Sequence, residues 1–97
     1  MGSDDLEIQH SEDQGRGGFF IEKDGARLAE QVYRRTDEHH VVIVHTSVDQ
    51  QLQGRGIARR LLDATVAWAR STGTRLAATC PYAKAQFEKD ASLRDVL

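Results

Sequence analysis

The sequence predicts an α+β fold in which antiparallel strands come first and a parallel β-α-β pair follows in the same mixed sheet. Three observations lead to this prediction. The dipeptide Asp24-Gly25 joins two segments that are rich in strand-forming residues. A β-branched run lies within residues 39–48. From Gly56 onward, the apolar residues recur with the period of a helix.

The first two strands are expected at 18–23 and 26–33, because Asp24-Gly25 between them supplies the positive φ of a tight antiparallel hairpin. The polar stretch 34–38 then predicts a turn. The next strand, 39–48, contains four consecutive aliphatic residues. This run favours burial on both faces and therefore a place at the centre of the sheet.

The segment after Gly56 is the strongest helix prediction in the chain. Its apolar positions fall on one helical face and include Ile57, Leu61, Ala64 and Trp68. Gly73 is expected to cap its carboxyl end, and 75–79 is short enough to be the next strand. Strand, helix and strand in this order predict a parallel pair with a right-handed crossover. Pro81 suits the first position of a last short helix over 81–89.

Length and composition limit the class of protein. The chain has 97 residues, 39% of them apolar, which predicts a single domain over residues 1–97 with one compact core. Its single cysteine, Cys80, cannot form an internal disulfide bond. Residues 1–14 carry five acidic side chains and no lysine or arginine. This composition predicts a solvated and partly flexible segment.

The charge balance and hydropathy exclude two classes of partner. The net charge is −2 and the sequence pI is about 6.0, which argues against a nucleic-acid binder despite the arginines between 55 and 70. The longest aliphatic run has four residues, whereas a membrane-spanning helix needs about 20. We therefore expect a cytoplasmic protein without a membrane partner, either a monomer or a weak dimer.

A glycine-rich turn, Gln51-Leu52-Gln53-Gly54-Arg55-Gly56, joins the β-branched strand to the long helix. Two glycines let the backbone turn its N–H groups toward one point, and the first turn of a helix carries unpaired N–H groups, so this position suits an anion such as a pyrophosphate. Neither a P-loop nor a dinucleotide-binding fingerprint matches, because Ile57-Ala58 and Arg59 stand where those motifs need other residues.

The pattern Gln51-x-x-Gly54-x-Gly56 resembles the acetyl-coenzyme A pyrophosphate motif of the GNAT N-acetyltransferase superfamily. The segments His45-Thr46-x-Val48 and Thr79-Cys80-x-Tyr82 extend the resemblance to its minimal subgroup of about a hundred residues, sometimes called YjdJ-like. The resemblance implies a GNAT-like mixed sheet whose parallel strands splay apart around acetyl-coenzyme A as co-substrate.

Carried onto this sequence, the resemblance assigns the co-substrate site. The backbone N–H groups from Gln53 through Ala58 would hold the pyrophosphate, and Val48 would line the thioester-bearing arm. Arg55 or Arg59 would reach the nucleotide phosphates. The predicted binding residues are Val48, Gln53, Gly54, Arg55, Gly56, Ile57, Ala58 and Arg59.

Two further residues are candidates for catalysis. Cys80 precedes a helix, whose dipole favours a thiolate, and it matches the subgroup's proposed catalytic cysteine; the alternative is a small buried apolar residue. His45 lies on the adjacent strand and is expected to share a cleft with Cys80 as a base, unless it is a core histidine. No metal site is expected, because His40 points away from His39 and His45 on an alternating strand.

The resemblance implies an N-acetyltransferase that moves an acetyl group to an unidentified amine of a small molecule or a protein. The amine attacks acetyl-coenzyme A directly, or the acetyl group passes through Cys80; the sequence leaves both routes open. Tyr82 is a candidate acid for the departing thiolate, although the wider superfamily carries its tyrosine further along the helix. The alternative function is an acyl-coenzyme A-binding or sensing module with little or no catalysis.

Overall fold

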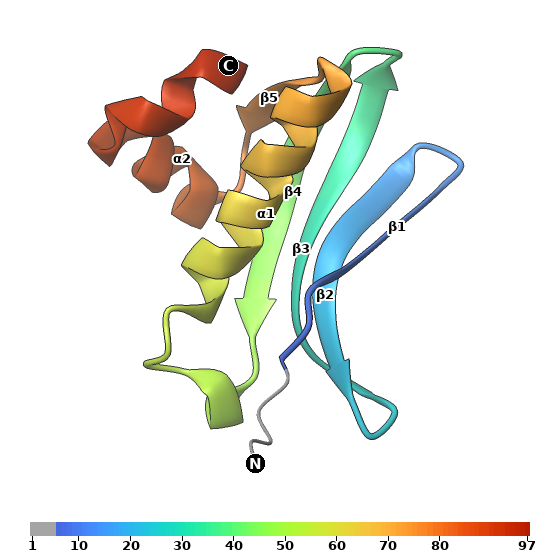
Figure 1. Cartoon of the computed structure of the whole chain (residues 1–97), viewed down its shortest axis with the longest axis vertical. Coiled ribbons are helices and arrows are strands. Elements are labelled where there is room, and N and C mark those ends of the chain that lie inside the picture. The colour runs from blue at the N-terminus through green and yellow to red at the C-terminus, as the bar shows by residue number, and fades with distance from the viewer. Residues whose placement is uncertain (1–5) are drawn as a thin grey trace.

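The computed structural model describes residues 6–97, which form one five-stranded mixed sheet with helices on one side (Figure 1). The strands are β1 (Gln9–Asp13), β2 (Arg16–Lys23), β3 (Ala26–Asp37), β4 (His40–Val48) and β5 (Arg75–Ala78), in that spatial order. The α-helices are α1 (Ile57–Thr72) and α2 (Pro81–Lys89), and the 3₁₀ helices are η1 (Gln50–Leu52) and η2 (Ala91–Val96). Strands β1 to β4 are antiparallel and β5 is parallel to β4, which confirms the predicted α+β class with a mixed sheet.

Both predicted helices and the predicted hairpin are present. Asp24 and Gly25 have φ of 53° and 81°, the positive values that a tight hairpin turn requires. Gly73 caps α1 in the left-handed conformation, and its N–H donates to the carbonyl of Ala69. Within the described part of the chain, no helix is long and apolar enough to span a membrane.

Strand β1 is an element that the sequence analysis did not predict. All five of its residues are exposed, so it lacks the alternation of apolar and polar residues that marks a half-buried strand. Its hairpin with β2 turns at Gln14 and Gly15, with φ of 53° and 79°, and glutamine is a weak signal for that conformation. Of the segment predicted to be partly flexible, residues 1–5 lie outside the described residues.

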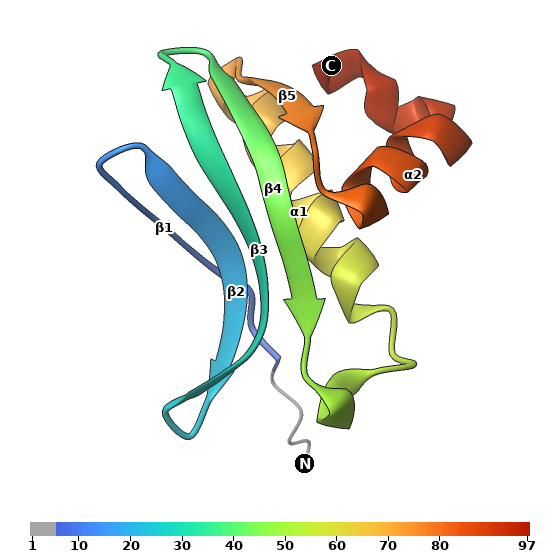
Figure 2. The ribbon, with the colours of Figure 1, turned by 180° about the vertical axis from the view of Figure 1, so that it is seen from behind.

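Two predictions about β3 and β4 were wrong. The polar stretch 34–38 is mostly strand, because β3 continues to Asp37 and the turn occupies only residues 38 and 39. Strand β4 is buried on one face, where Val41 and Ile43 are 1% and 0% exposed, while its neighbours Val42 and Val44 are half-buried. Figure 2 shows the reason: the second face of the sheet carries no helix of the described residues, and β4 lies beside the centre rather than at it.

The core lies between α1 and the sheet. Leu61, Leu62 and Val66 on α1 are at most 1% exposed and pack in one cluster with Ile21 and Ile43 of the sheet. Burial of such side chains stabilises the fold by about 1.5–3 kcal/mol each. Because α1 is anchored along its length, the position of its first turn relative to β4 is fixed.

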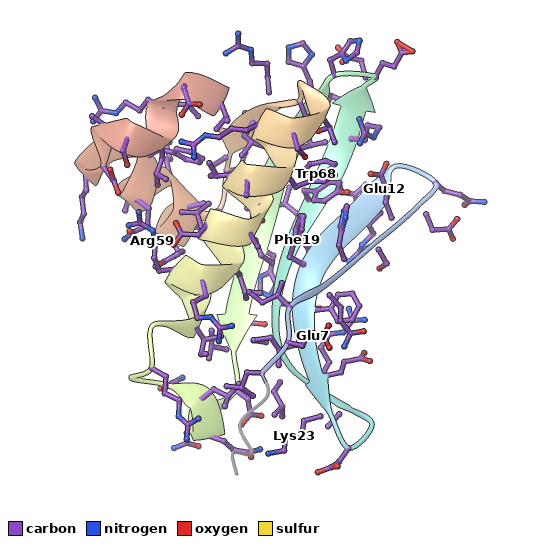
Figure 3. All side chains as sticks on the ribbon, in the orientation of Figure 1. Glu7, Glu12, Phe19, Lys23, Arg59 and Trp68 are labelled. Carbon is purple, nitrogen blue, oxygen red and sulfur yellow. The ribbon has the colours of Figure 1, made fainter. Side chains whose placement is uncertain are left out.

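A cluster of polar and aromatic side chains fastens β1 to the rest of the sheet (Figure 3). The hydroxyl of Tyr33 donates to the carboxylate of Glu12 at 2.7 Å, and Arg35 donates to the same carboxylate at 2.6 and 3.0 Å. The ring of Tyr33 stacks on Trp68 of α1 at 5.2 Å between centroids. The Arg35 guanidinium, followed by the Tyr33 hydroxyl, lowers the pKa of Glu12 from 4.5 to about 2.

We expect this carboxylate to make the fold sensitive to acid. Because the pKa of Glu12 is lower in the folded state, its stabilisation is present above about pH 4.5 and is lost as pH falls toward 2. Glu12→Gln should lower the free energy of unfolding at pH 7 by about 1–2 kcal/mol and flatten its dependence on pH below 4.5. Urea unfolding between pH 2 and 7 measures both effects.

The matched control is Glu22→Gln, which removes a carboxylate from an exposed ion pair with Arg27. The side chains of Arg27 and Glu22 are 44% and 41% exposed. An exposed pair contributes little, so this variant should change the free energy of unfolding by less than about 0.5 kcal/mol. Equal effects of the two substitutions would contradict the role of Glu12 in holding β1.

Candidate active site

Strand β5 is shorter than its parallel neighbour β4 and leaves one edge of β4 open. Their last paired residues are Ile43 and Ala78, and β4 continues to Val48. Beyond this point, the N–H groups of Thr79 and Cys80 both donate to the carbonyl of Ile43, at 3.0 and 3.1 Å, and turn the chain into α2. The backbone edge of β4 over residues 44–48 therefore faces α2 without a strand partner among the described residues.

A pocket of about 260 Å³ lies at the end of this opening, against the first turn of α1. It is lined by Val48, Leu52, Gln53, Gly54, Gly56, Ile57, Ala58, Arg59 and Tyr82. The structure thus brings around one pocket all the predicted co-substrate residues except Arg55. Leu52 and Tyr82 also line the pocket, and Tyr82 is the residue predicted as a candidate acid.

The backbone of the glycine-rich turn presents open N–H groups to this region. Gly54 and Gly56 have φ of 83° and 70°, and the first α-helical bond runs from Arg60 N–H to the carbonyl of Gly56 at 3.1 Å. Among the described residues, no acceptor lies on the N–H groups of Gly54 and Gly56 or of residues 57–59. Since the first turn of α1 also contains no acidic side chain, this end of the helix suits an anion.

One predicted donor does not belong to this set. The N–H of Gln53 donates to the carbonyl of Gln50 at 3.3 Å, where it closes the turn of η1. A backbone group that already has a partner contributes less to an external ligand. The open N–H groups are therefore those of Gly54, Gly56 and residues 57–59.

A β-carbon at either glycine would meet nothing within 4 Å. The two positions are therefore open space in front of the backbone rather than tight packing sites. Glycine is needed there for the left-handed φ, and its lack of a side chain leaves the N–H groups accessible to a ligand. The site therefore leaves room for an anion in front of these N–H groups.

Arg59 ties α1 to α2 (Figure 3) and does not extend toward a ligand in this structure. Its guanidinium donates to Asp63 at 2.9 Å and to the side-chain carbonyl of Gln86 at 3.0 Å, and it pairs with Asp90. The carboxylates of Asp63 and Asp90 raise the pKa of Arg59 above its ordinary value. Of the two arginines predicted to reach the nucleotide phosphates, Arg59 therefore links the two helices. Arg55 is exposed on the turn beside the pocket.

Cys80 stands at the predicted place, immediately before α2, and its side chain is 2% exposed. Its sulfur lies 3.2 Å from the hydroxyl oxygen of Thr46 on β4. Tyr82 follows on the first turn of α2, and burial raises its pKa, so its side chain is a protonated phenol at neutral pH.

The structure does not bring His45 and Cys80 together as predicted. In the pairing of β3 with β4, Val32 lies opposite His45 but Tyr33 lies opposite Ile43, so Val44 is an extra residue that forms a β-bulge. The bulge reverses the alternation. His45 shares the open face of the sheet with Val32 and is exposed, whereas Thr46 takes the helix-covered face beside Cys80.

Sequence reasoning missed the polar partners of Cys80. Thr46 belongs to the quoted motif but was given no role, because strict alternation would place it on the other face. Gln31, which is 1% exposed, bonds to Thr46 at 3.1 Å. Its position between Ala29 and Tyr33 on one face of β3 was the available signal, since a glutamine among core residues on an alternating strand needs a buried partner.

A mixed sheet of antiparallel strands with one parallel pair, and a helix with an open N-terminus beside the end of β4, agree with the N-acetyltransferase class of folds that the sequence resembles. The model of the GCN5-related N-acetyl-transferase family matches residues 18–96. The chain belongs to this family. No curated protein shows significant sequence similarity to it.

Solved structures agree with this assignment. A GCN5-like protein from Staphylococcus aureus, solved by NMR, is 35% identical, with a TM-score of 0.74 over 97% of this chain and 89% of that one. Ribosomal-protein-alanine N-acetyltransferase from Brucella melitensis is 18% identical with a TM-score of 0.63, and this chain covers 64% of its length. A GNAT family acetyltransferase from Elizabethkingia anophelis with acetyl-CoA bound is 17% identical with a TM-score of 0.58, and this chain covers half of it. The last two similarities concern the fold.

Proposed function

We propose that this chain is an acetyl-coenzyme A-dependent N-acetyltransferase of the minimal YjdJ-like type, acting in the cytoplasm on an amine. The observation that carries the proposal is the set of open N–H groups of Gly54, Gly56 and the first turn of α1, beside the unpaired edge of β4. The pyrophosphate of coenzyme A would accept from these groups. Its pantetheine arm would run past Val48 along the unpaired edge of β4, and Arg55 would approach the nucleotide phosphates.

The proposed chemistry uses Cys80 as a nucleophile. The thiolate of Cys80 attacks the acetyl carbonyl carbon, a carbon–sulfur bond forms to Cys80, and the bond to the sulfur of coenzyme A breaks. Tyr82 gives its proton to the departing thiolate of coenzyme A and regains a proton from water before the next turnover. Its raised pKa supports this role, because a protonated phenol is available at neutral pH.

The second step returns the thiolate and acetylates the amine. A small-molecule amine or a protein amine approaches Cys80 beside the unpaired edge of β4. Its neutral nitrogen attacks the acetyl carbon on Cys80, the bond to the cysteine sulfur breaks, and the amine proton passes to water.

Calorimetric titration with coenzyme A tests the binding half of this proposal without requiring the acceptor. We expect binding in the micromolar range at neutral pH and moderate salt. Absence of binding at millimolar coenzyme A would overturn the proposal. Tight binding with no transfer to any amine offered would indicate an acyl-coenzyme A-binding module instead of an enzyme.

A further inference from the structure

A chain of buried hydrogen bonds crosses the core from α1 to Cys80. The hydroxyl of Thr65 on α1 donates to the side-chain carbonyl of Gln31 on β3 at 2.8 Å, and the Gln31 amide donates to the hydroxyl oxygen of Thr46 at 3.1 Å. That oxygen lies 3.2 Å from the sulfur of Cys80. Thr65, Gln31 and Cys80 are 0%, 1% and 2% exposed, so these bonds lie in the core, with half-buried Thr46 at the strand edge.

The direction of each bond follows from the donors available. A threonine hydroxyl has one proton, and Thr65 uses it toward the carbonyl oxygens of Gln31 and Leu61. The amide nitrogen of Gln31 is therefore the end that faces Thr46, and it can only donate. The Thr46 oxygen accepts that proton, so its own hydroxyl proton is left for the sulfur of Cys80.

We propose that Gln31 and Thr46 are positioning residues that keep a hydroxyl proton directed at the Cys80 sulfur and so favour its thiolate form. This inference rests on the proposed role of Cys80. A hydrogen bond to an ionised acceptor is roughly twice as strong as one to a neutral acceptor, so a fixed donor stabilises the thiolate more than the thiol. The bond also holds the sulfur against β4, where the strand edge is open.

The Thr46 hydroxyl lies within hydrogen-bond distance of the Cys80 sulfur. Tyr82, two residues further along on α2, is protonated at neutral pH. Arg59 and Asp63 act on Tyr82, and Arg59 is paired with Asp63 and Asp90. At the N-terminus of α2, the helix dipole adds to the same preference for negative charge.

The rate of alkylation of Cys80 by iodoacetamide as a function of pH tests the inference, since the chain has one cysteine and the thiolate is the reacting form. Thr46→Val removes the hydroxyl at nearly constant shape. We expect alkylation about tenfold slower at pH 7 and a pH profile shifted to higher pH. Thr46→Ser keeps the hydroxyl and should restore both.

The control is Thr74→Val, which removes the hydroxyl of another buried threonine, one that bonds to Thr72 at the far end of α1. This variant should leave the profile unchanged. If Thr46→Val fails to fold, as judged by urea unfolding, Gln31→Leu replaces it and should shift the profile in the same direction by a smaller amount. A profile that superimposes on that of the unmodified protein in the folded variant would overturn the inference.

The experiment uses no coenzyme A, so its outcome is independent of the proposed transferase activity. Coenzyme A titration of the unmodified protein is run in parallel, because it tests the proposed function without involving the Thr46 hydroxyl. Lost binding in the unmodified protein would overturn the proposed function, whereas an unshifted profile with intact binding would overturn only the role of Gln31 and Thr46.

Discussion

Replacing Gly56 with alanine is expected to weaken binding of coenzyme A by about tenfold or more, which corresponds to at least about 1.4 kcal/mol. A β-carbon at this residue meets no protein atom within 4 Å, so it would project into the space proposed for the pyrophosphate. It would also force a left-handed φ of 70° on a residue with a side chain. Calorimetric titration measures the affinity, and urea unfolding measures the stability.

Gly73→Ala is a matched control at the opposite end of the same helix. Gly73 has φ and ψ of 70° and 26°, against 70° and 24° at Gly56, and its β-carbon would likewise meet nothing within 4 Å. Both substitutions should therefore lower the free energy of unfolding by a similar amount, about 1–2 kcal/mol. Only Gly56→Ala should weaken binding. An equal loss of affinity in the two variants would mean that helix stability, not a phosphate site at Gly56, governs the binding.

The co-substrate pocket could be predicted because its parts are local. The two glycines, the strand before them and the helix after them adjoin in sequence, and their conformations follow from residue type and hydrophobic period. The structure accordingly places Val48 and residues 56–58 around one pocket. The side-chain task of Arg59 was not predictable, because its partners Gln86 and Asp90 are about thirty residues away.

The environment of Cys80 could not be predicted for a related reason. A single inserted residue, Val44, moves Thr46 to the covered face of β4 and His45 to the open one. A β-branched run gives no sequence signal for a bulge. A register change of one residue moves the side chains that follow it to the opposite face of the strand. Strand β1 was missed because its pairing depends on side-chain bonds from Glu12 to Tyr33 and Arg35.

Incubation with acetyl-coenzyme A alone is expected to add one acetyl group to the protein, and Cys80→Ala should abolish this addition. The acetyl group would be held as a thioester, so treatment with hydroxylamine should release it. With a lysine peptide as the acceptor, Cys80→Ala should lower turnover by about a hundredfold or more, because the nucleophile of the first step is gone. Intact-protein mass spectrometry and release of free coenzyme A measure the two effects.

Two further variants test this route. Cys80→Ser keeps a small polar partner for Thr46 but offers a weaker nucleophile, so it should bind coenzyme A normally and transfer poorly. His45→Gln should leave both steps unchanged, because His45 lies on the face of the sheet opposite Cys80. Undiminished turnover in Cys80→Ala would eliminate the covalent route and leave direct attack by the amine.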